Sequence, residues 1–245
     1  MIRMMDKFFE RLMFLVLFVG FTSLLVLNVF TYNKVEDLKT ANAKSAEFIN
    51  EVRDSNDSKF NDMNSRMQEQ ADKMRILQQE LDEGKEAVKA LKENGIHPNT
   101  DIGANSKITT ADMNRVIDYY DKHVRGGTPF KNRGEVFIKA SRVTGLNPIY
   151  LFAHAACESS YGNSYLAKTR KNYFGINAVD SDPGRASHMG DDIEEGIVSG
   201  AVWIKQNYYD NGYTTLSSMK NAGYASDPNW ARNISSVANT AISVL

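Results

Sequence analysis

Residues 155–178 read AACESSYGNSYLAKTRKNYFGINA, and they place one carboxylate, Glu158, at the end of an otherwise apolar helix. Residues 149–153, which read IYLFA, add no charge on the upstream side, and Gly162 breaks the helix and begins a loop rich in Asn, Tyr and Phe. Because apolar walls disfavour an ionised carboxyl, we expect the pKa of Glu158 to be raised. A carboxyl with a raised pKa can donate a proton near neutral pH, as a general acid must.

Four blocks follow one another over residues 130–245: ESSYGNSYLA from Glu158, NYFGINAVDSDP from Asn172, GIVSGAVWI from Gly196 and GYASDPNWA from Gly223. In this order they resemble the glucosaminidase domain of Gram-positive autolysins and phage lysins. The resemblance implies an endo-β-N-acetylglucosaminidase that acts on peptidoglycan, with a mostly helical, lysozyme-like α+β fold and a small β-lobe over a cleft. It assigns the general acid to Glu158 and an essential role at the cleft to Tyr224.

A glycosidase also needs a group that stabilises the oxocarbenium-like transition state or activates water. Asp180, in the Asp-Ser-Asp-Pro turn, is the preferred carboxylate for this role. Others are available at Asp182, Asp191, Asp192 and Glu194, although Asp191 or Asp192 would also cap the helix that follows. Alternatively, the 2-acetamido oxygen of the substrate attacks the anomeric carbon itself, and Tyr224 orients it.

Sugar rings present apolar faces edged by hydroxyl groups, which aromatic and short polar side chains match. Phe174 and Trp203 are assigned to the core. The residues predicted to bind substrate are Tyr161, Asn172, Tyr173, Asn177, Asp182, Asp227 and Trp230.

The composition excludes several classes of protein. A net charge of −1 over 245 residues gives no basic surface for nucleic acid. The single cysteine, Cys157, excludes an intrachain disulfide framework. Cys157 lies three residues after His154, but packing as a small buried hydrophobe explains it better than nucleophilic chemistry. The four histidines have no metal-ligand spacing, and no cofactor is expected.

Residues 1–32 are predicted to anchor the chain in a membrane. Leu12 to Phe30 form 19 nearly all apolar residues without a Lys, Arg, Asp or Glu, which as a helix span about 28 Å. A cleaved signal peptide normally has a shorter apolar region. Basic residues flank both ends, so their count does not orient the segment. We expect the catalytic domain on the wall-facing side, or in a phage virion, because the substrate lies there.

Residues 33–93 predict a coiled-coil stalk, because apolar residues recur at alternating steps of three and four. The repeat changes frame between Val52 and Phe60, and Asn, Ser, Gln and Gly occupy several seam positions. A weak or conditional homo-oligomer is therefore expected. Residues 94–107, with two glycines and Pro98, are predicted to form a linker.

The catalytic domain is predicted over residues 108–245. Thr109 or Thr110 would cap its first helix, Gly145 would end the helix 134–144, and Asn147-Pro148 would begin the helix of Glu158. Further helices are expected over 193–208, 215–220 and 229–244. The candidate for a short strand is Phe174–Val179.

These features predict a membrane-tethered peptidoglycan hydrolase with Glu158 as its acid, used in bacterial wall remodelling or in wall penetration by a phage. Two other classes remain open. One is a lytic transglycosylase, which uses a similar acid on a similar fold but cleaves after N-acetylmuramic acid. The other is an inactive lysozyme-like module that binds glycan on a membrane-anchored structural stalk.

Overall fold

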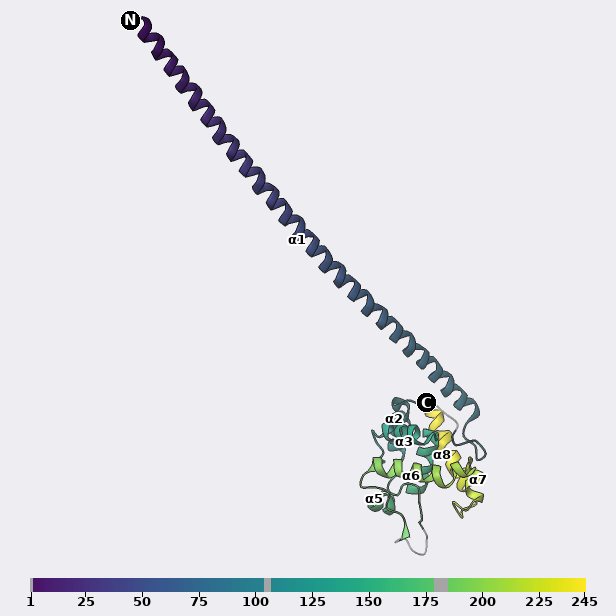
Figure 1. Cartoon of the computed structure of the whole chain (residues 1–245). Helices are drawn as coiled ribbons and strands as arrows, with labels where there is room; N and C mark the ends of the chain where they lie inside the picture. Colours follow the sequence, from purple (N-terminus) through teal and green to yellow (C-terminus); the bar gives the residue numbers. More distant parts are fainter. Residues whose placement is uncertain (1, 104–106, 179–184) are drawn as a thin grey trace. The chain divides into compact units, whose positions relative to one another are not determined.

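The computed structural model describes residues 2–103, 107–178 and 185–245, with side chains from Met5 onward. The chain divides into two compact units, residues 1–74 and residues 75–245. A single helix, α1 (Ile2–Asn94), supplies the whole described part of the first unit and the beginning of the second (Figure 1). The described residues are mostly helical, as the sequence predicts.

The described part of the first unit is helix α1 as far as Met74, and nearly all of its side chains from Met5 onward are exposed. Its most apolar 18-residue window has a mean hydropathy of 2.5, so by length and composition it can cross a membrane. A signal sequence near an N-terminus passes the same test. Farther along, Phe60, Met63 and Met67 of the predicted seam are more than half exposed. The stalk's self-association therefore stays a prediction.

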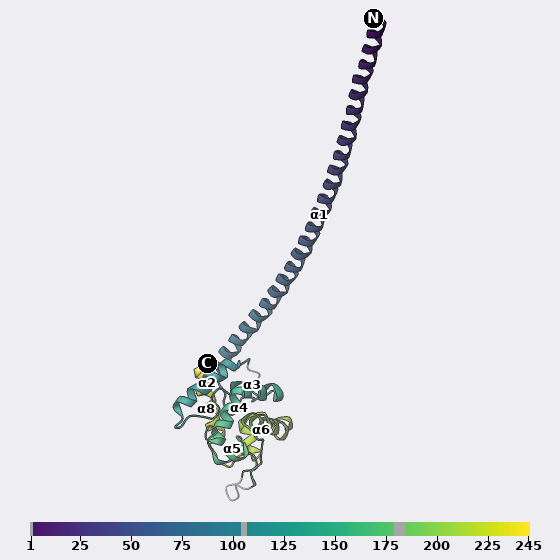
Figure 2. The same cartoon turned by 90° about the vertical axis from the view of Figure 1, so that its left-hand side faces the viewer.

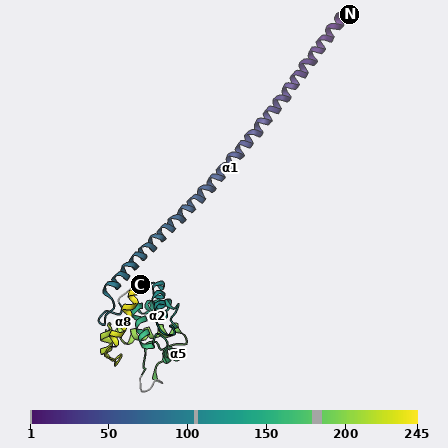
Figure 3. The ribbon, with the colours of Figure 1, turned by 180° about the vertical axis from the view of Figure 1, so that it is seen from behind.

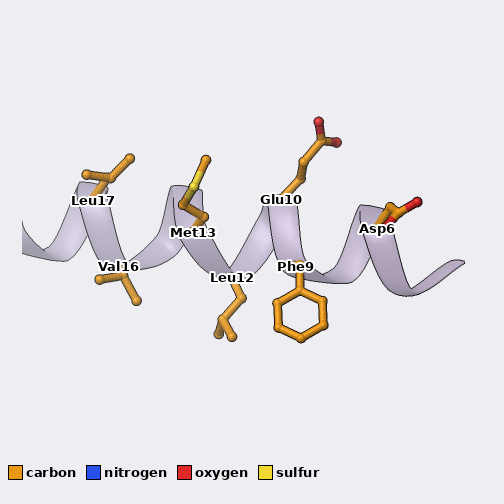
Figure 4. Close-up of a pocket in the computed structure, with 7 residues that line it drawn as sticks. All are labelled: Asp6, Phe9, Glu10, Leu12, Met13, Val16 and Leu17. Carbon is orange, nitrogen blue, oxygen red and sulfur yellow. The ribbon is translucent and has the colours of Figure 1, made fainter. Parts of the chain in front are cut away.

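The first turns of α1 carry their side chains on two sides of a lone helix. Figure 4 shows Asp6, Glu10, Met13 and Leu17 on one side, and Phe9, Leu12 and Val16 on the other. These residues line a shallow depression of about 650 Å³. Because all seven come from one helix, the depression has no opposing wall, and we assign no site to it.

The second unit contains the helices α2 (Thr110–His123), α3 (Gly134–Thr144), α4 (Pro148–Ser159), α5 (Tyr165–Arg170), α6 (Ile193–Asn207), α7 (Leu216–Asn221) and α8 (Trp230–Val244), with a short 3-10 turn, η2 (Tyr209–Asn211). Helix α4 packs against α3 and α8, and α3 also packs against α2 and α6 (Figure 2). Figure 3 shows the end of α8 beside α2, where Arg115 donates a hydrogen bond to the carbonyl of Leu245. Residues 148–156 of α4 are all buried, so this helix lies in the core of the second unit.

The helix ends confirm the predicted capping residues. Thr109 forms a capping box with Asp112 at the start of α2. Asn147 caps α4 ahead of Pro148, and Gly145 ends α3 with a φ of 73°. Asp192 accepts a hydrogen bond from the backbone N–H of Glu195 at 2.8 Å, so it caps α6. These local signals set the borders of α4, and so place Glu158 in its last turn.

The predicted linker contributes to the core of the second unit. Ile96 and Ile102 are 2% and 1% exposed. The side-chain oxygen of Asn239 accepts a hydrogen bond from the backbone N–H of Ile96 at 2.9 Å. The backbone N–H of Ile102 donates to the carbonyl of Thr214, and the carbonyl of Ile102 accepts from the N–H of Asn147. Residues 95–102 are therefore attached to the helices that follow.

We expect Ile96→Ala to lower the free energy of unfolding by about 2–5 kcal/mol, because the truncation leaves a cavity in the core. Ile76→Ala is the matched control: Ile76 lies in the same unit but is 54% exposed. It should change stability by less than about 0.5 kcal/mol. Denaturant unfolding of the detergent-solubilised chain measures both. Equal effects would contradict the placement of residue 96 in the core.

The strand expected at Phe174–Val179 is absent over its described part, residues 174–178. These residues form turns, and Gly175 and Asn177 have φ values of 69° and 54°. Among the described residues the β-structure is an isolated bridge between Asp101 and Thr215, so the small β-lobe is not confirmed. The left-handed glycine and asparagine turn the chain here, so no strand forms over these residues. Helix α5 was not predicted.

Candidate active site

A cavity of about 540 Å³ lies beside the end of α4. Its walls come from α4, from the turns at 172–178, from the loop that precedes α8, and from α8 itself. The lining residues are Cys157, Glu158, Leu166, Asn172, Gly175, Ala178, Tyr224, Ala225, Ser226, Asp227, Trp230 and Asn233. Three of the four sequence blocks that predicted the family therefore meet in one place.

Glu158 contributes a carboxyl group to this cavity from the last turn of α4. The helix is apolar and buried over residues 148–156, and it ends where Ser160 takes a left-handed conformation. The side chain of Glu158 is 23% exposed. Burial raises the pKa of Glu158, a hydrogen bond from the Trp230 indole lowers it in part, and the charge of Asp227 raises it further. The raised pKa agrees with the prediction and suits a proton donor.

Gly175 leaves the room that this carboxyl needs. Its φ is 69°, and a Cβ built on it would lie 2.8 Å from Oε2 of Glu158. The two oxygens of the Glu158 carboxyl have different neighbours. Oε1 accepts the hydrogen bond from the Trp230 indole, and Oε2 faces the backbone at Gly175, which lines the cavity.

Asn172 builds the turn that carries Gly175. Its side-chain oxygen accepts a hydrogen bond from the N–H of Ile176 at 2.9 Å, and its amide group donates to the carbonyls of Ile176 and Ser187. The side chain is 1% exposed. The amide is therefore occupied within the protein, and its predicted contact with sugar stays a prediction.

Tyr224 and Trp230 form an aromatic wall next to Glu158. Their ring centroids are 5.0 Å apart, and the Tyr224 hydroxyl donates to the carbonyl of Phe174 at 2.8 Å. Asp227 shapes the turn between them: it accepts hydrogen bonds from the backbone of Asn229 at 2.8 Å and from the side chain of Asn233 at 3.3 Å. Asp227 is exposed, and it is the second carboxylate among the described residues of the cavity.

The other predicted site residues lie elsewhere. Tyr173 is 2% exposed and packs against Phe130, and Tyr161 stacks on Tyr120 in a separate depression. Asn177 is exposed and donates to the Ser187 hydroxyl at 2.9 Å. The predicted second carboxylate, Asp180, and its neighbour Asp182 lie outside the described residues. The structure therefore brings together Glu158, Asn172, Tyr224, Asp227 and Trp230 of the predicted set.

Cys157 lines the cavity but is not suited to attack. Burial, with a smaller contribution from Glu158, raises the pKa of the Cys157 thiol to about 12. A thiol that stays protonated at neutral pH is a weak nucleophile. Elsewhere in the described residues, no group of three or more His, Cys, Asp or Glu side chains is arranged to hold a metal ion.

Sequence reasoning missed two contributors to this site, Gly175 and His154, and one contact of a third, the hydrogen bond from Trp230 to Glu158. Trp230 was expected to bind substrate, yet it is 5% exposed and donates to Glu158. Gly175 and His154 were not considered as neighbours of the carboxyl. A signal was present for His154, because residues four apart share one face of a helix.

Comparison with known proteins identifies the class of domain that this site belongs to. Residues 134–242 match the glucosaminidase family model, described as mannosyl-glycoprotein endo-beta-N-acetylglucosaminidase. The chain thus carries a glucosaminidase-family domain over these residues, as the four sequence blocks predicted. This is a family of glycoside hydrolases.

Two relatives illustrate the likeness. A Streptococcus pneumoniae protein assigned by name to the endo-beta-N-acetylglucosaminidases is 43% identical over 110 residues, which cover 44% of this chain and 17% of the relative. The bifunctional autolysin of Staphylococcus aureus is 33% identical over 147 residues, which cover 49% of this chain and 12% of that protein. The chain therefore spans less than a fifth of the length of these relatives.

The fold is also that of a solved structure. A catalytic mutant of S. aureus autolysin E, determined in complex with the disaccharide NAG-NAM, aligns with a TM-score of 0.52 at 24% identity. The alignment covers 65% of this chain and 90% of that one. The second unit therefore has an autolysin-like fold.

Proposed function

We propose that this protein is a peptidoglycan hydrolase that cleaves the β-1,4 bond after N-acetylglucosamine, with Glu158 as general acid. The observation that carries the proposal is a largely buried carboxyl with a raised pKa at the wall of an open cavity, within a glucosaminidase-family domain. The relatives point the same way, since one is an autolysin and another is assigned to endo-beta-N-acetylglucosaminidases.

In the proposed reaction, Glu158 transfers its proton to the glycosidic oxygen as the bond from that oxygen to the anomeric carbon breaks. The leaving sugar keeps the bonding electrons and the proton. The positive charge on the remaining sugar must be stabilised by a carboxylate or by the acetamido oxygen of the substrate. Water then adds to the anomeric carbon, and the proton that it releases returns to the Glu158 carboxylate. Asp180 stays our candidate for a carboxylate that stabilises this charge. Asp227 places a negative charge in the described cavity, and Tyr224 is our candidate for orienting the acetamido group.

We expect Trp230→Phe to move the alkaline limb of the pH–activity profile to higher pH. The Trp230 indole lowers the pKa of Glu158, so losing its N–H destabilises the ionised carboxyl and raises that pKa. A general acid works while it is protonated, and the protonated range then extends upward. The rate at the optimum should fall about 10-fold as the carboxyl loses its anchor. A limb that moves to lower pH would contradict this role of Trp230.

Analysis of the products formed by the full-length chain in detergent tests the proposed function. Digested peptidoglycan should carry reducing-end N-acetylglucosamine. Anhydro-muramic ends would identify a lytic transglycosylase instead. Glycan binding with no cleavage at any pH would identify a binding module, and would overturn the enzymic proposal.

We further propose that residues 12–30 anchor the chain in a membrane and that residues 33–93 form a self-associating stalk. The predicted boundaries are 1–32 for the anchor, 33–93 for the stalk, 94–107 for the linker and 108–245 for the catalytic domain, although residues 95–102 pack with the second unit. The proposal is supported by the long apolar start of α1 and by the exposed seam residues Phe60, Met63, Met67, Met74, Leu77 and Leu81. Val88 and Leu91 of the same seam pack against the core of the second unit. The domain would then act on glycan strands at the wall-facing side, in bacterial wall remodelling or in a phage virion. Protease protection in sealed vesicles tests the orientation, and analytical ultracentrifugation in detergent tests the self-association.

A further inference from the structure

His154 is a buried polar side chain that the proposed reaction does not yet use. It lies one helical turn before Glu158 on α4, and it is 0% exposed. Its Nδ1 is 2.9 Å from the hydroxyl of Tyr150. Its Nε2 is buried without a hydrogen-bond partner among the described residues. Buried polar atoms in native proteins are nearly always paired, so this nitrogen requires an explanation.

The unpaired nitrogen faces the carboxyl of Glu158. Nε2 lies 3.9 Å from Oε1 of Glu158, which is beyond direct hydrogen-bond distance but close enough for a small rotation to join them. The rings of Phe174, Tyr224 and Trp230 surround the imidazole, with centroids 4.9–5.4 Å away. These rings restrict the orientations that the imidazole can take. The carboxyl of Glu158 is therefore the polar group that Nε2 can reach.

The hydroxyl of Tyr150 sets which nitrogen of His154 carries the proton. Burial lowers the pKa of His154 to about 3, so the ring is neutral and holds one N–H. The Tyr150 hydroxyl can donate to Nδ1 or to the Met219 sulfur, which is 3.7 Å away. A thioether is a weak acceptor, whereas an imidazole nitrogen is a strong one. The stronger acceptor thus favours donation from the hydroxyl to Nδ1, which leaves the ring proton on Nε2. In the opposite arrangement an Nδ1–H donates to the hydroxyl and the hydroxyl donates to Met219, so the tautomer decides between the two.

The Nε2–H group and the Trp230 indole consequently approach the same carboxylate oxygen. Both approach Oε1 of Glu158, whereas Oε2 lies beside Gly175, one of the residues that line the cavity. Two donors at Oε1 favour the proton on Oε2, from which the substrate would receive it. As that proton leaves, negative charge develops on the carboxylate beside two N–H groups. Donors placed where charge develops lower the energy of a transition state.

We propose that His154 is a positioning residue for Glu158: its Nε2–H, fixed by Tyr150, orients the carboxyl with Oε2 toward the substrate and stabilises the carboxylate left behind. This inference rests on the proposed function of Glu158 as general acid. The other ionisable groups near Glu158 are Tyr150, Cys157 and Tyr224, all kept neutral by burial, and Asp227, whose charge opposes ionisation.

Two variants of His154 test the effect of losing its N–H donor separately from the effect of changing the shape of its side chain. His154→Phe keeps a planar ring and loses the donor, so the pKa of Glu158 should rise. The alkaline limb of the pH–rate profile should then move to higher pH, and kcat should fall by about 10-fold or more with KM nearly unchanged. His154→Gln keeps an N–H donor and should place the limb near that of the wild type. A limb that His154→Phe leaves unmoved, or moves to lower pH, would overturn the proposal.

A measurement on the unaltered protein does not depend on how the variants fold. In the full-length chain labelled with ¹⁵N-histidine, the one solvent-excluded histidine signal should be a neutral ring with its proton on Nε2, and Tyr150→Phe should change that tautomer. A proton on Nδ1 in the wild type would exclude the proposed donor. This spectrum needs no hydrolysis, so it separates failure of the positioning role from failure of the hydrolase proposal.

Discussion

Glu158→Gln is expected to reduce the rate of glycan cleavage by about 10²–10⁴-fold while the domain stays folded. Glutamine has nearly the shape of the carboxylic acid and can still accept the hydrogen bond from Trp230. It has no proton that it can transfer to a leaving oxygen, so the acid step is lost. Dye release from labelled peptidoglycan measures the rate, and thermal unfolding checks the fold.

Glu194→Gln provides the matched control for that variant. Glu194 is on α6, outside the residues that line the cavity, and it forms a surface ion pair with Lys139. Exposed ion pairs contribute little to stability, so both the rate and the melting temperature should stay near the wild-type values. If Glu158→Gln cleaved peptidoglycan as fast as Glu194→Gln, the general acid would have to be another residue.

Gly175→Ala is expected to reduce cleavage on the order of 10²-fold, because it displaces the acid without altering its chemistry. The new methyl carbon would lie 2.8 Å from Oε2 of Glu158, which is closer than a Cβ atom lies to a neighbouring nonbonded atom in real structures. Either the carboxyl or the turn at 172–178 must move. A misplacement of about 1 Å is enough to cost two orders of magnitude in rate.

Gly212→Ala is the control that shows the cost of placing alanine at a left-handed φ without a contact between the new Cβ and a neighbouring atom. Gly212 has a left-handed φ of 86°, similar to the 69° of Gly175, but a Cβ there would meet nothing within 4 Å. Both variants should therefore lose about 1 kcal/mol of stability from backbone strain. Gly175→Ala alone should lose activity. Wild-type turnover by Gly175→Ala would show that Oε2 is not held against this backbone.

The order of helices could be predicted because its signals are local. Thr109, Gly145, Asn147 and Pro148 set helix ends through bonds and torsions within a few residues of themselves. Apolar periodicity then identified the buried faces. The failures also have a local origin: a strand was expected over Phe174–Val179, but Gly175 and Asn177 take left-handed conformations that turn the chain. The short helix α5 has too few residues for a periodic pattern to be recognised.

The proton donor could be predicted from sequence, but most of its surroundings could not. Glu158 stands out as a charge at the end of an apolar helix, and the order of the four blocks gives it a context. Its partner Trp230 is 72 residues away, and only the packing of α4 on α8 brings the two together. The same holds for Asn239, which binds Ile96 across 143 residues. Contacts of this range depend on tertiary packing.

The distance along the chain between Glu158 and Trp230 also bears on when the proposed centre becomes complete during synthesis. A ribosome completes α4 well before it reaches α8, so a nascent chain with an exposed acid lacks the wall and the indole that orient it. A truncated mRNA that encodes Glu158 but not Trp230 would yield a protein without the complete site. The proposed centre with its orienting indole would thus be complete only after α8 has been synthesised.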